Sequence, residues 1–181
     1  GGFGWGEVMA FSGSPQGAVD GWMDTLYHRV PLIHPNTESY GYGISLQGAA
    51  CDVIDGNYGK ALLPGPARWP LPNTTNVAVK WMGWESPQPP LPADQSYPSG
   101  PVITITFPRS TPMKLTSAVL LDPSGEEVPA QVQTPENDSW LSTTWAIYAY
   151  NPLMGQSTYT VRFEGTVQGA PYTDTWSFTT Q

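Results

Sequence analysis

The chain has 181 residues, of which 39% are apolar and only 12% are charged, so it can bury a hydrophobic core and disorder over its whole length is excluded. Its 15 Asp and Glu outnumber 7 Lys and Arg, and the resulting net charge of −8, with no basic stripe, excludes nucleic acid as a partner and disfavours anionic membrane surfaces. No apolar run approaches the roughly 20 residues that span a bilayer. A single cysteine, Cys51, rules out an internal disulfide.

Residues 14–28 carry the one clear helical pattern. Ser14 can cap the helix and Pro15 suits its first position. Apolar residues then recur at helical spacing, at Ala18, Val19, Trp22, Met23 and Leu26. Because Pro31 has no backbone donor and disfavours a helical residue before it, the helix is expected to end near His28 or Arg29.

The segments that follow predict short strands and then a connector. Residues 40–55 read as short strands that complete an N-terminal unit, residues 1–63. Residues 64–101 hold ten of the 20 prolines, which predicts an extended connector over residues 64–100. One strand is expected inside this connector, where Val77, Val79 and Trp81 alternate with other residues.

Residues 101–181 predict an all-β domain. Apolar side chains alternate with polar ones in several short runs separated by turn residues, as in a sandwich with one wet face per sheet. The inward positions expected from this alternation are Ile103, Ile105, Phe107, Trp145, Ile147, Ala149, Tyr159, Val161, Phe163, Trp176 and Phe178.

A series of short motifs resembles bacterial members of the CAP superfamily, the group of cysteine-rich secretory proteins, antigen 5 and pathogenesis-related proteins. The matching residues are Gly6-Glu7-Val8-Met9-Ala10, Ser14-Pro15, Ala18-Val19, Trp22-Met23, His28-Arg29 and Tyr40-Gly41-Tyr42-Gly43. The sequence departs from the family at Val8, where Asn is usual, and at Thr25-Leu26-Tyr27, which replaces Ser-Pro-Gly. The resemblance implies an extracellular or cell-surface protein whose residues 1–63 are the C-terminal part of an α-β-α sandwich.

The end of the chain resembles bacterial Ig-like domains. The resemblance is carried by Tyr159-Thr160-Val161 and by Trp176-Ser177-Phe178-Thr179-Thr180. Together, the two resemblances predict an α+β chain, with a partial CAP sandwich followed by an Ig-like β-sandwich over residues 101–181.

The CAP resemblance also implies a cleft in which His and acidic residues meet. Glu7 matches the family's Gly-Glu acid and His28 the His of its His-Arg pair, and in some members the cleft binds a divalent cation. Asp24 lies one helical turn before His28, so it is a third candidate ligand, or a partner that orients the imidazole, for zinc or calcium. The alternative is a structural hydrogen bond between Glu7 and His28. His34 is expected to be a solvated loop residue.

Several tryptophans stand in Gly, Pro or Ser contexts and are candidates for exposure. Trp5 and Trp84 are candidates for stacking on a ligand, and the alternative is that such rings pack against prolines. The chain has no Gly-x-Ser-x-Gly elbow and only two His, so no complete catalytic set is visible.

The sequence therefore predicts a non-enzymatic module that binds an extracellular ligand, a cation, or a cell-surface glycan or protein, with the Ig-like domain as spacer or adhesion unit. Two alternatives remain. One is a cation-dependent hydrolase whose site is completed by a missing N-terminal segment. The other is a purely structural surface component.

Overall fold

The computed structural model describes residues 6–12, 14–45, 51–61 and 65–181. Its strands form antiparallel sheets in the orders β1-β3-β2, β10-β9-β6 and β4-β5-β8-β7. The elements, in chain order, are β1 (Gly6–Ala10), α1 (Pro15–Asp24), α2 (Arg29–Ile33), β2 (Thr37–Ser45), β3 (Cys51–Tyr58), β4 (Ala67–Trp69), β5 (Ile103–Thr106), β6 (Met113–Leu121), β7 (Ala130–Gln133), β8 (Thr144–Ala149), β9 (Thr158–Val167) and β10 (Ala170–Thr179).

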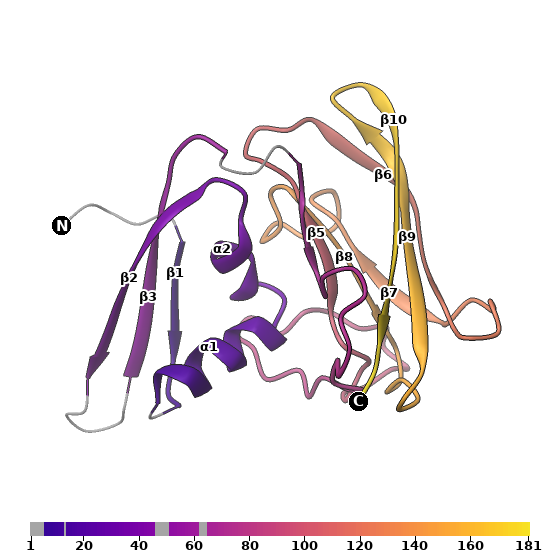
Figure 1. Cartoon of the computed structure of the whole chain (residues 1–181), viewed down its shortest axis with the longest axis horizontal. Coiled ribbons are helices and arrows are strands. Elements are labelled where there is room, and N and C mark those ends of the chain that lie inside the picture. The colour runs from indigo at the N-terminus through magenta and orange to yellow at the C-terminus, as the bar shows by residue number, and fades with distance from the viewer. Residues whose placement is uncertain (1–5, 13, 46–50, 62–64) are drawn as a thin grey trace.

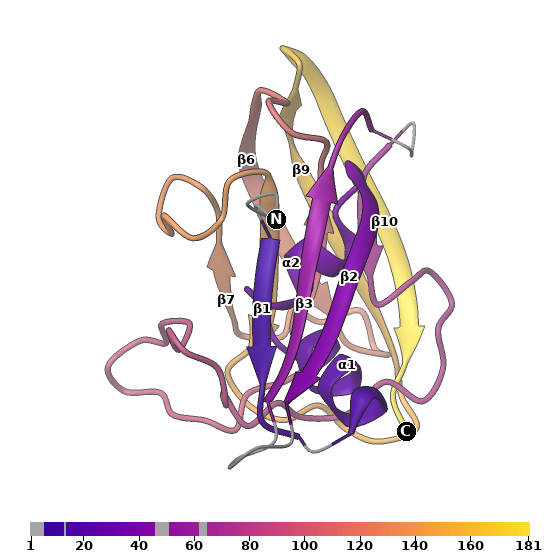
Figure 2. The ribbon, with the colours of Figure 1, turned by 90° about the vertical axis from the view of Figure 1, so that its left-hand side faces the viewer.

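The N-terminal sheet, β1-β3-β2, carries both helices on one face. Side chains alternate along β1, so Val8 points toward α1 and packs with Ala18 and Trp22 in a small apolar core. The Ser14 Oγ caps α1 as predicted by accepting the N–H of Gly17 at 3.2 Å. The helices lie between this sheet and the rest of the molecule (Figure 1), and the three strands stand side by side in front of them in Figure 2.

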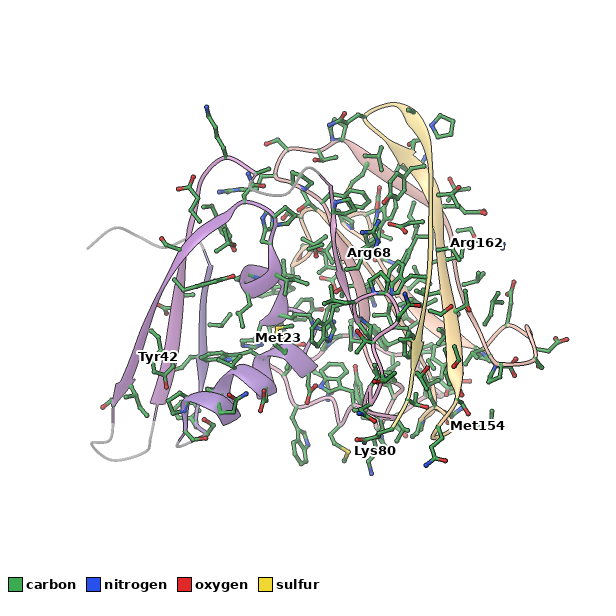
Figure 3. All side chains as sticks on the ribbon, in the orientation of Figure 1. Met23, Tyr42, Arg68, Lys80, Met154 and Arg162 are labelled. Carbon is green, nitrogen blue, oxygen red and sulfur yellow. The ribbon has the colours of Figure 1, made fainter. Side chains whose placement is uncertain are left out.

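The other two sheets pack around the main hydrophobic core. Trp145, Phe163 and Trp176 are buried there and stack in one row, with ring centroids 6.3 Å and 5.7 Å apart. Burial of each such side chain stabilises the fold by about 1.5–3 kcal/mol. Side chains fill the space between the two layers (Figure 3). The sandwich-like arrangement predicted for residues 101–181 is therefore confirmed.

The proline-rich segment is attached to the sandwich rather than hanging free. Its strand, β4, pairs with β5, and this pairing adds an edge to the four-stranded sheet. Val77 forms a parallel bridge with Thr180, and Trp81 forms an antiparallel bridge with Ser99. The alternating residues 77–81 thus bridge to other segments at two points, and the regular strand of this segment lies earlier, at β4.

A second apolar cluster joins the N-terminal unit to the sandwich. Leu26, which follows α1, is buried against Trp81 from the proline-rich segment and Tyr148 from β8. Because these side chains come from distant parts of the sequence, the cluster fixes the N-terminal unit against the sandwich.

The predicted α+β fold class, with a partial CAP α-β-α sandwich, is wrong. The described residues are mostly β and contain two helices, of 10 and 5 residues. Both helices lie on the same side of β1-β3-β2, so among these residues the sheet has one helical layer and not two. Beyond residue 33 the sequence has strand periodicity and turn residues in place of helical spacing.

The predicted helix over residues 14–28 is shorter than expected, because α1 ends at Asp24. Thr25 is extended, and both its N–H and its hydroxyl bond to the Trp22 carbonyl oxygen. Pro31 does not end a helix. It lies in the first turn of α2, where the missing N–H has no intrahelical partner to lose.

Candidate functional site

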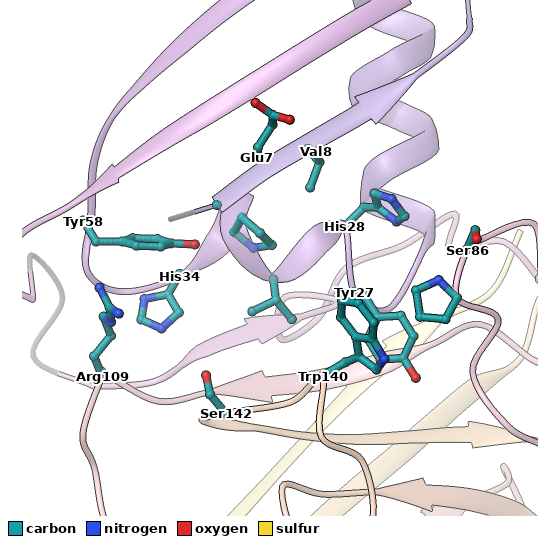
Figure 4. Close-up of a pocket in the computed structure, with 14 residues that line it drawn as sticks. Glu7, Val8, Tyr27, His28, His34, Tyr58, Ser86, Arg109, Trp140 and Ser142 are labelled. Atoms are coloured by element: carbon teal, nitrogen blue, oxygen red, sulfur yellow. The ribbon is translucent and has the colours of Figure 1, made fainter. Parts of the chain in front are cut away.

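A cavity of about 310 Å³ lies where the N-terminal unit meets the sandwich. One wall comes from β1 and from the segment that follows α1, and the opposite wall from loops of the sandwich and the proline-rich segment. The residues that shape it include Val8, Tyr27, His28, His34, Tyr58, Ser86, Arg109, Trp140 and Ser142, labelled in Figure 4. Both units are therefore needed to form the cavity.

His28 is held at this cavity by a buried carboxylate. Glu85 Oε1 lies 2.7 Å from Nδ1 of His28, and the side chain of Glu85 is 0% exposed while that of His28 is 24% exposed. When Nδ1–H donates to the carboxylate, the neutral ring keeps Nε2 as its free acceptor. The pair thus fixes the orientation of the imidazole and the position of its proton.

The same carboxylate organises the backbone that follows α1. Glu85 Oε2 accepts the N–H of Leu26 at 2.9 Å, and Oε1 accepts those of Tyr27 at 2.7 Å and His28 at 2.9 Å. A buried charge is tolerated only when it is well hydrogen-bonded, and these donors meet that need. Glu85 therefore fixes both the backbone of the loop that carries His28 and the orientation of the His28 ring.

A second buried carboxylate, Asp138, binds two aromatic residues at the cavity. The Tyr27 hydroxyl donates to Asp138 Oδ2 at 2.6 Å, and Asp138 Oδ1 accepts the backbone N–H of Trp140 at 3.0 Å. The rings of Tyr27 and Trp140 then lie with their centroids 6.1 Å apart, tilted by 42°. Burial, reinforced by the hydrogen bond to Asp138, raises the pKa of Tyr27, so its hydroxyl stays protonated.

The second imidazole of the cavity, His34, is buried and not a solvated loop residue as expected. Its Nδ1 accepts the N–H of Asn36 at 3.1 Å, and Nε2 lies 3.4 Å from the Thr143 hydroxyl. Burial, and then the charge of Arg109, lower the pKa of His34 to about 4, so the ring is neutral at pH 7. The Arg109 guanidinium lies 5.1 Å from the centroid of the Tyr58 ring.

Arg29, which follows His28, connects the two units from inside. It is buried, its Nε donates to the Met23 carbonyl at 2.6 Å, and its Nη1 donates to the Val102 carbonyl at 2.9 Å and to Thr104 Oγ1 at 3.3 Å. Burial lowers the pKa of Arg29 to about 9, and this leaves the guanidinium charged at neutral pH. The His-Arg pair thus places one residue at the cavity and the next in the junction.

The structure brings together only part of the predicted set of site residues. Glu7 lines the same cavity as His28. It alternates with the buried Val8 on β1, however, and its exposed carboxylate points away from the imidazole (Figure 4). Asp24 lines a different cavity, of about 290 Å³, together with Arg29. The hydrogen-bond partner of His28 is therefore Glu85.

The two predicted stacking residues are placed differently. Trp5 lies outside the described residues. Trp84 is 81% exposed but is not among the residues that line the cavity, where Trp140, 65% exposed, supplies the accessible indole.

Among the described residues, no group of three or more His, Cys, Asp or Glu is close enough to hold a metal ion. Ser86 and Ser142 line the cavity, but neither hydroxyl is hydrogen-bonded to His28, so this part of the chain shows no paired nucleophile and base. What the cavity does offer is hydrogen-bonding groups beside an aromatic surface. These are the features of a binding site.

Sequence reasoning missed Glu85 and did not single out Trp140. One signal for Glu85 was available, since it is the only charged residue between Lys80 and Asp94 in a proline-rich stretch. Trp140 had the same kind of sequence context as Trp84, and only the fold shows which of the two lies at the cavity.

No helix in the described part of the chain is long and apolar enough to cross a membrane. In comparisons with known proteins, no family model and no curated protein matches the sequence.

Proposed function

We propose that this chain is a non-enzymatic ligand-binding module of an extracellular or cell-surface protein, and that its ligand occupies the cavity at the junction. The observation that carries the proposal is the cavity itself, whose imidazole is fixed by a fully buried carboxylate. A positioned polar group in a mixed polar and aromatic hollow is typical of specific ligand sites.

The extracellular setting is supported by composition and by resemblance. The chain has few Lys and Arg and a net charge of −8, and residues 6–43 resemble the motifs of secreted CAP proteins. The sandwich is more than a spacer in this proposal, because Arg109, Trp140 and Ser142 belong to it and line the cavity.

Ligand binding can be tested by thermal unfolding with a panel of probes. The panel contains neutral oligosaccharides, short peptides, fatty acids, and zinc and calcium salts. A ligand that binds only the folded state stabilises it by about 2.7 kcal/mol at one hundred times its Kd, which raises the Tm measurably. We expect at least one class of probe to raise the Tm of the wild-type protein.

A blocking variant shows whether the effect arises at the cavity. Ser142 is exposed and lines the cavity, so Ser142→Trp should fill the space without disturbing the core. Thr166→Trp, on the exposed face of β9, is the matched control. Stabilisation lost in Ser142→Trp and kept in Thr166→Trp supports the proposal. Stabilisation kept in both variants contradicts it, and catalytic turnover of a probe would favour the hydrolase instead.

A further inference from the structure

Trp140 presents an exposed but well-positioned aromatic face at the cavity. The residue is 65% exposed, its backbone N–H donates to the buried Asp138, and its ring lies beside that of Tyr27. An aromatic side chain whose backbone is already ordered offers a large contact area at little further cost in conformational entropy. The other ring at this point, Tyr27, is tied by its hydroxyl to the same carboxylate. Tyr27 is only partly exposed, so Trp140 offers the more accessible aromatic surface for stacking.

Hydrogen-bonding groups line the same cavity. The imidazole of His28 has its Nδ1 occupied by Glu85, and this leaves Nε2 for a ligand. Ser86 and Ser142 add hydroxyls, each of which can both donate and accept. A ligand that matches this lining has an apolar face for the indole and hydroxyl groups along its edge.

The charges around the cavity disfavour an anionic ligand. The chain as a whole carries a net charge of −8 and repels anions over distance. Arg109 is the one permanent cation among the residues that line the cavity, and its guanidinium already lies over the Tyr58 ring. The described residues also contain no group of three or more His, Cys, Asp or Glu that could coordinate a metal ion, so the cavity does not favour a metal cation either.

From these features we infer that the ligand is a neutral oligosaccharide, whose sugar ring stacks on Trp140 while its hydroxyls bond to His28 and to the serines of the cavity. This inference rests on the ligand-binding function proposed above. Pyranose rings have an apolar C–H face and polar edges, which match the indole and the hydrogen-bonding groups that line the same cavity.

The test is isothermal titration calorimetry of the full 181-residue chain. The probes are neutral hexasaccharides of glucose, xylose and N-acetylglucosamine, and a hexamer of galacturonic acid as the anionic counterpart. Trp140→Ala is compared with Trp84→Ala, which removes an indole that is 81% exposed but does not line the cavity. Both side chains are exposed, so both variants should fold, and their Tm values check this.

The expected result is that at least one neutral hexasaccharide binds and that the galacturonic acid hexamer binds more weakly or not at all. Trp140→Ala should raise the Kd by about tenfold or more, corresponding to the loss of about 1.4 kcal/mol of stacking. Trp84→Ala should change the Kd by less than about twofold. His28→Ala should also raise the Kd, compared with that of the Trp84→Ala control.

Three results would overturn the saccharide inference: no neutral hexasaccharide binds, the acidic hexamer binds most tightly, or the two tryptophan variants lose affinity equally. If a peptide or fatty acid binds instead, and Ser142→Trp abolishes that binding, the proposed function stands and the saccharide inference alone fails. If no probe responds to Ser142→Trp, both fail together.

Discussion

The Glu85 carboxylate and the His28 imidazole, 57 residues apart in the sequence, meet with 2.7 Å between Oε1 and Nδ1. The same carboxylate binds the backbone N–H groups of residues 26–28. One side chain of the proline-rich segment therefore ties down the loop after α1 and orients the imidazole at the cavity. The structure of this loop and the orientation of the imidazole therefore depend on the same residue.

Removing this carboxylate should destabilise the protein strongly. Glu85→Ala leaves backbone donors and an imidazole without their acceptor, and we expect the free energy of unfolding to fall by about 3 kcal/mol. Urea denaturation measures the change. Glu126→Ala, in an exposed turn, is the control and should alter stability by less than about 0.5 kcal/mol. Equal effects of the two substitutions would show that the Glu85 network is not stabilising.

Even a conservative substitution of Arg29 should destabilise the protein. Lys cannot reproduce the hydrogen bonds that the buried guanidinium makes to Met23, Val102 and Thr104, so Arg29→Lys should lower the free energy of unfolding by about 2–4 kcal/mol. Arg162→Lys is the matched control, because Arg162 is exposed and forms a surface ion pair with Glu164, at 3.4 Å. A control variant as unstable as Arg29→Lys would contradict this assignment, and denaturant titration distinguishes the two.

The hydroxyl of Tyr27 should contribute to stability through Asp138. Tyr27→Phe removes the donor at 2.6 Å and leaves a buried carboxylate oxygen with one partner fewer, which should cost about 1–3 kcal/mol. Tyr150→Phe is the comparison, since Tyr150 makes no side-chain hydrogen bond within the described residues. If thermal unfolding gives the same Tm for the two variants, the Tyr27 hydroxyl has no structural role.

Stability should also decrease in mild acid because of His34. Its pKa falls from 6.5 to about 4 on folding, so between these values the unfolded chain binds a proton that the folded chain excludes. The free energy of unfolding should therefore drop as the pH is lowered from about 6.5 to about 4, by up to about 3 kcal/mol from this group.

The His34 contribution can be separated from that of the carboxylates with His34→Gln. This variant keeps hydrogen-bonding groups at the position but has no imidazole to protonate. In urea denaturation between pH 4 and pH 7, its free energy of unfolding should depend less steeply on pH than that of the wild type. Parallel pH profiles would assign the acid sensitivity to other groups.

The sequence predicted what depends on local pattern. Ser14 and Pro15 begin a helix, and the alternation around Trp145 and Trp176 forms a buried sandwich core, because caps and strand periodicity act over a few residues. The same local pattern predicted too long a helix, because α1 ends at Asp24 and not near residue 28. Nothing near Asp24 in the sequence indicates that Glu85 will accept the next N–H groups from 57 to 59 residues away.

The candidate site was predictable only in part for the same reason. His28 was expected at a cleft, and it lines a cavity, but its alignment with Asp24 required a helix that continues through Thr25. The outward direction of the Glu7 side chain follows from the alternation of side chains between the two faces of a strand. Val8 takes the buried face of β1, so the neighbouring carboxylate is directed outward.

Because both units line the cavity, a bound molecule should make them harder to separate. A molecule that binds only while both walls are in place adds its binding free energy to the free energy needed to separate the N-terminal unit from the sandwich. At a concentration one hundred times its Kd, that increment is about 2.7 kcal/mol. Under tension, the loaded protein should therefore hold its two halves together at forces that separate the empty one.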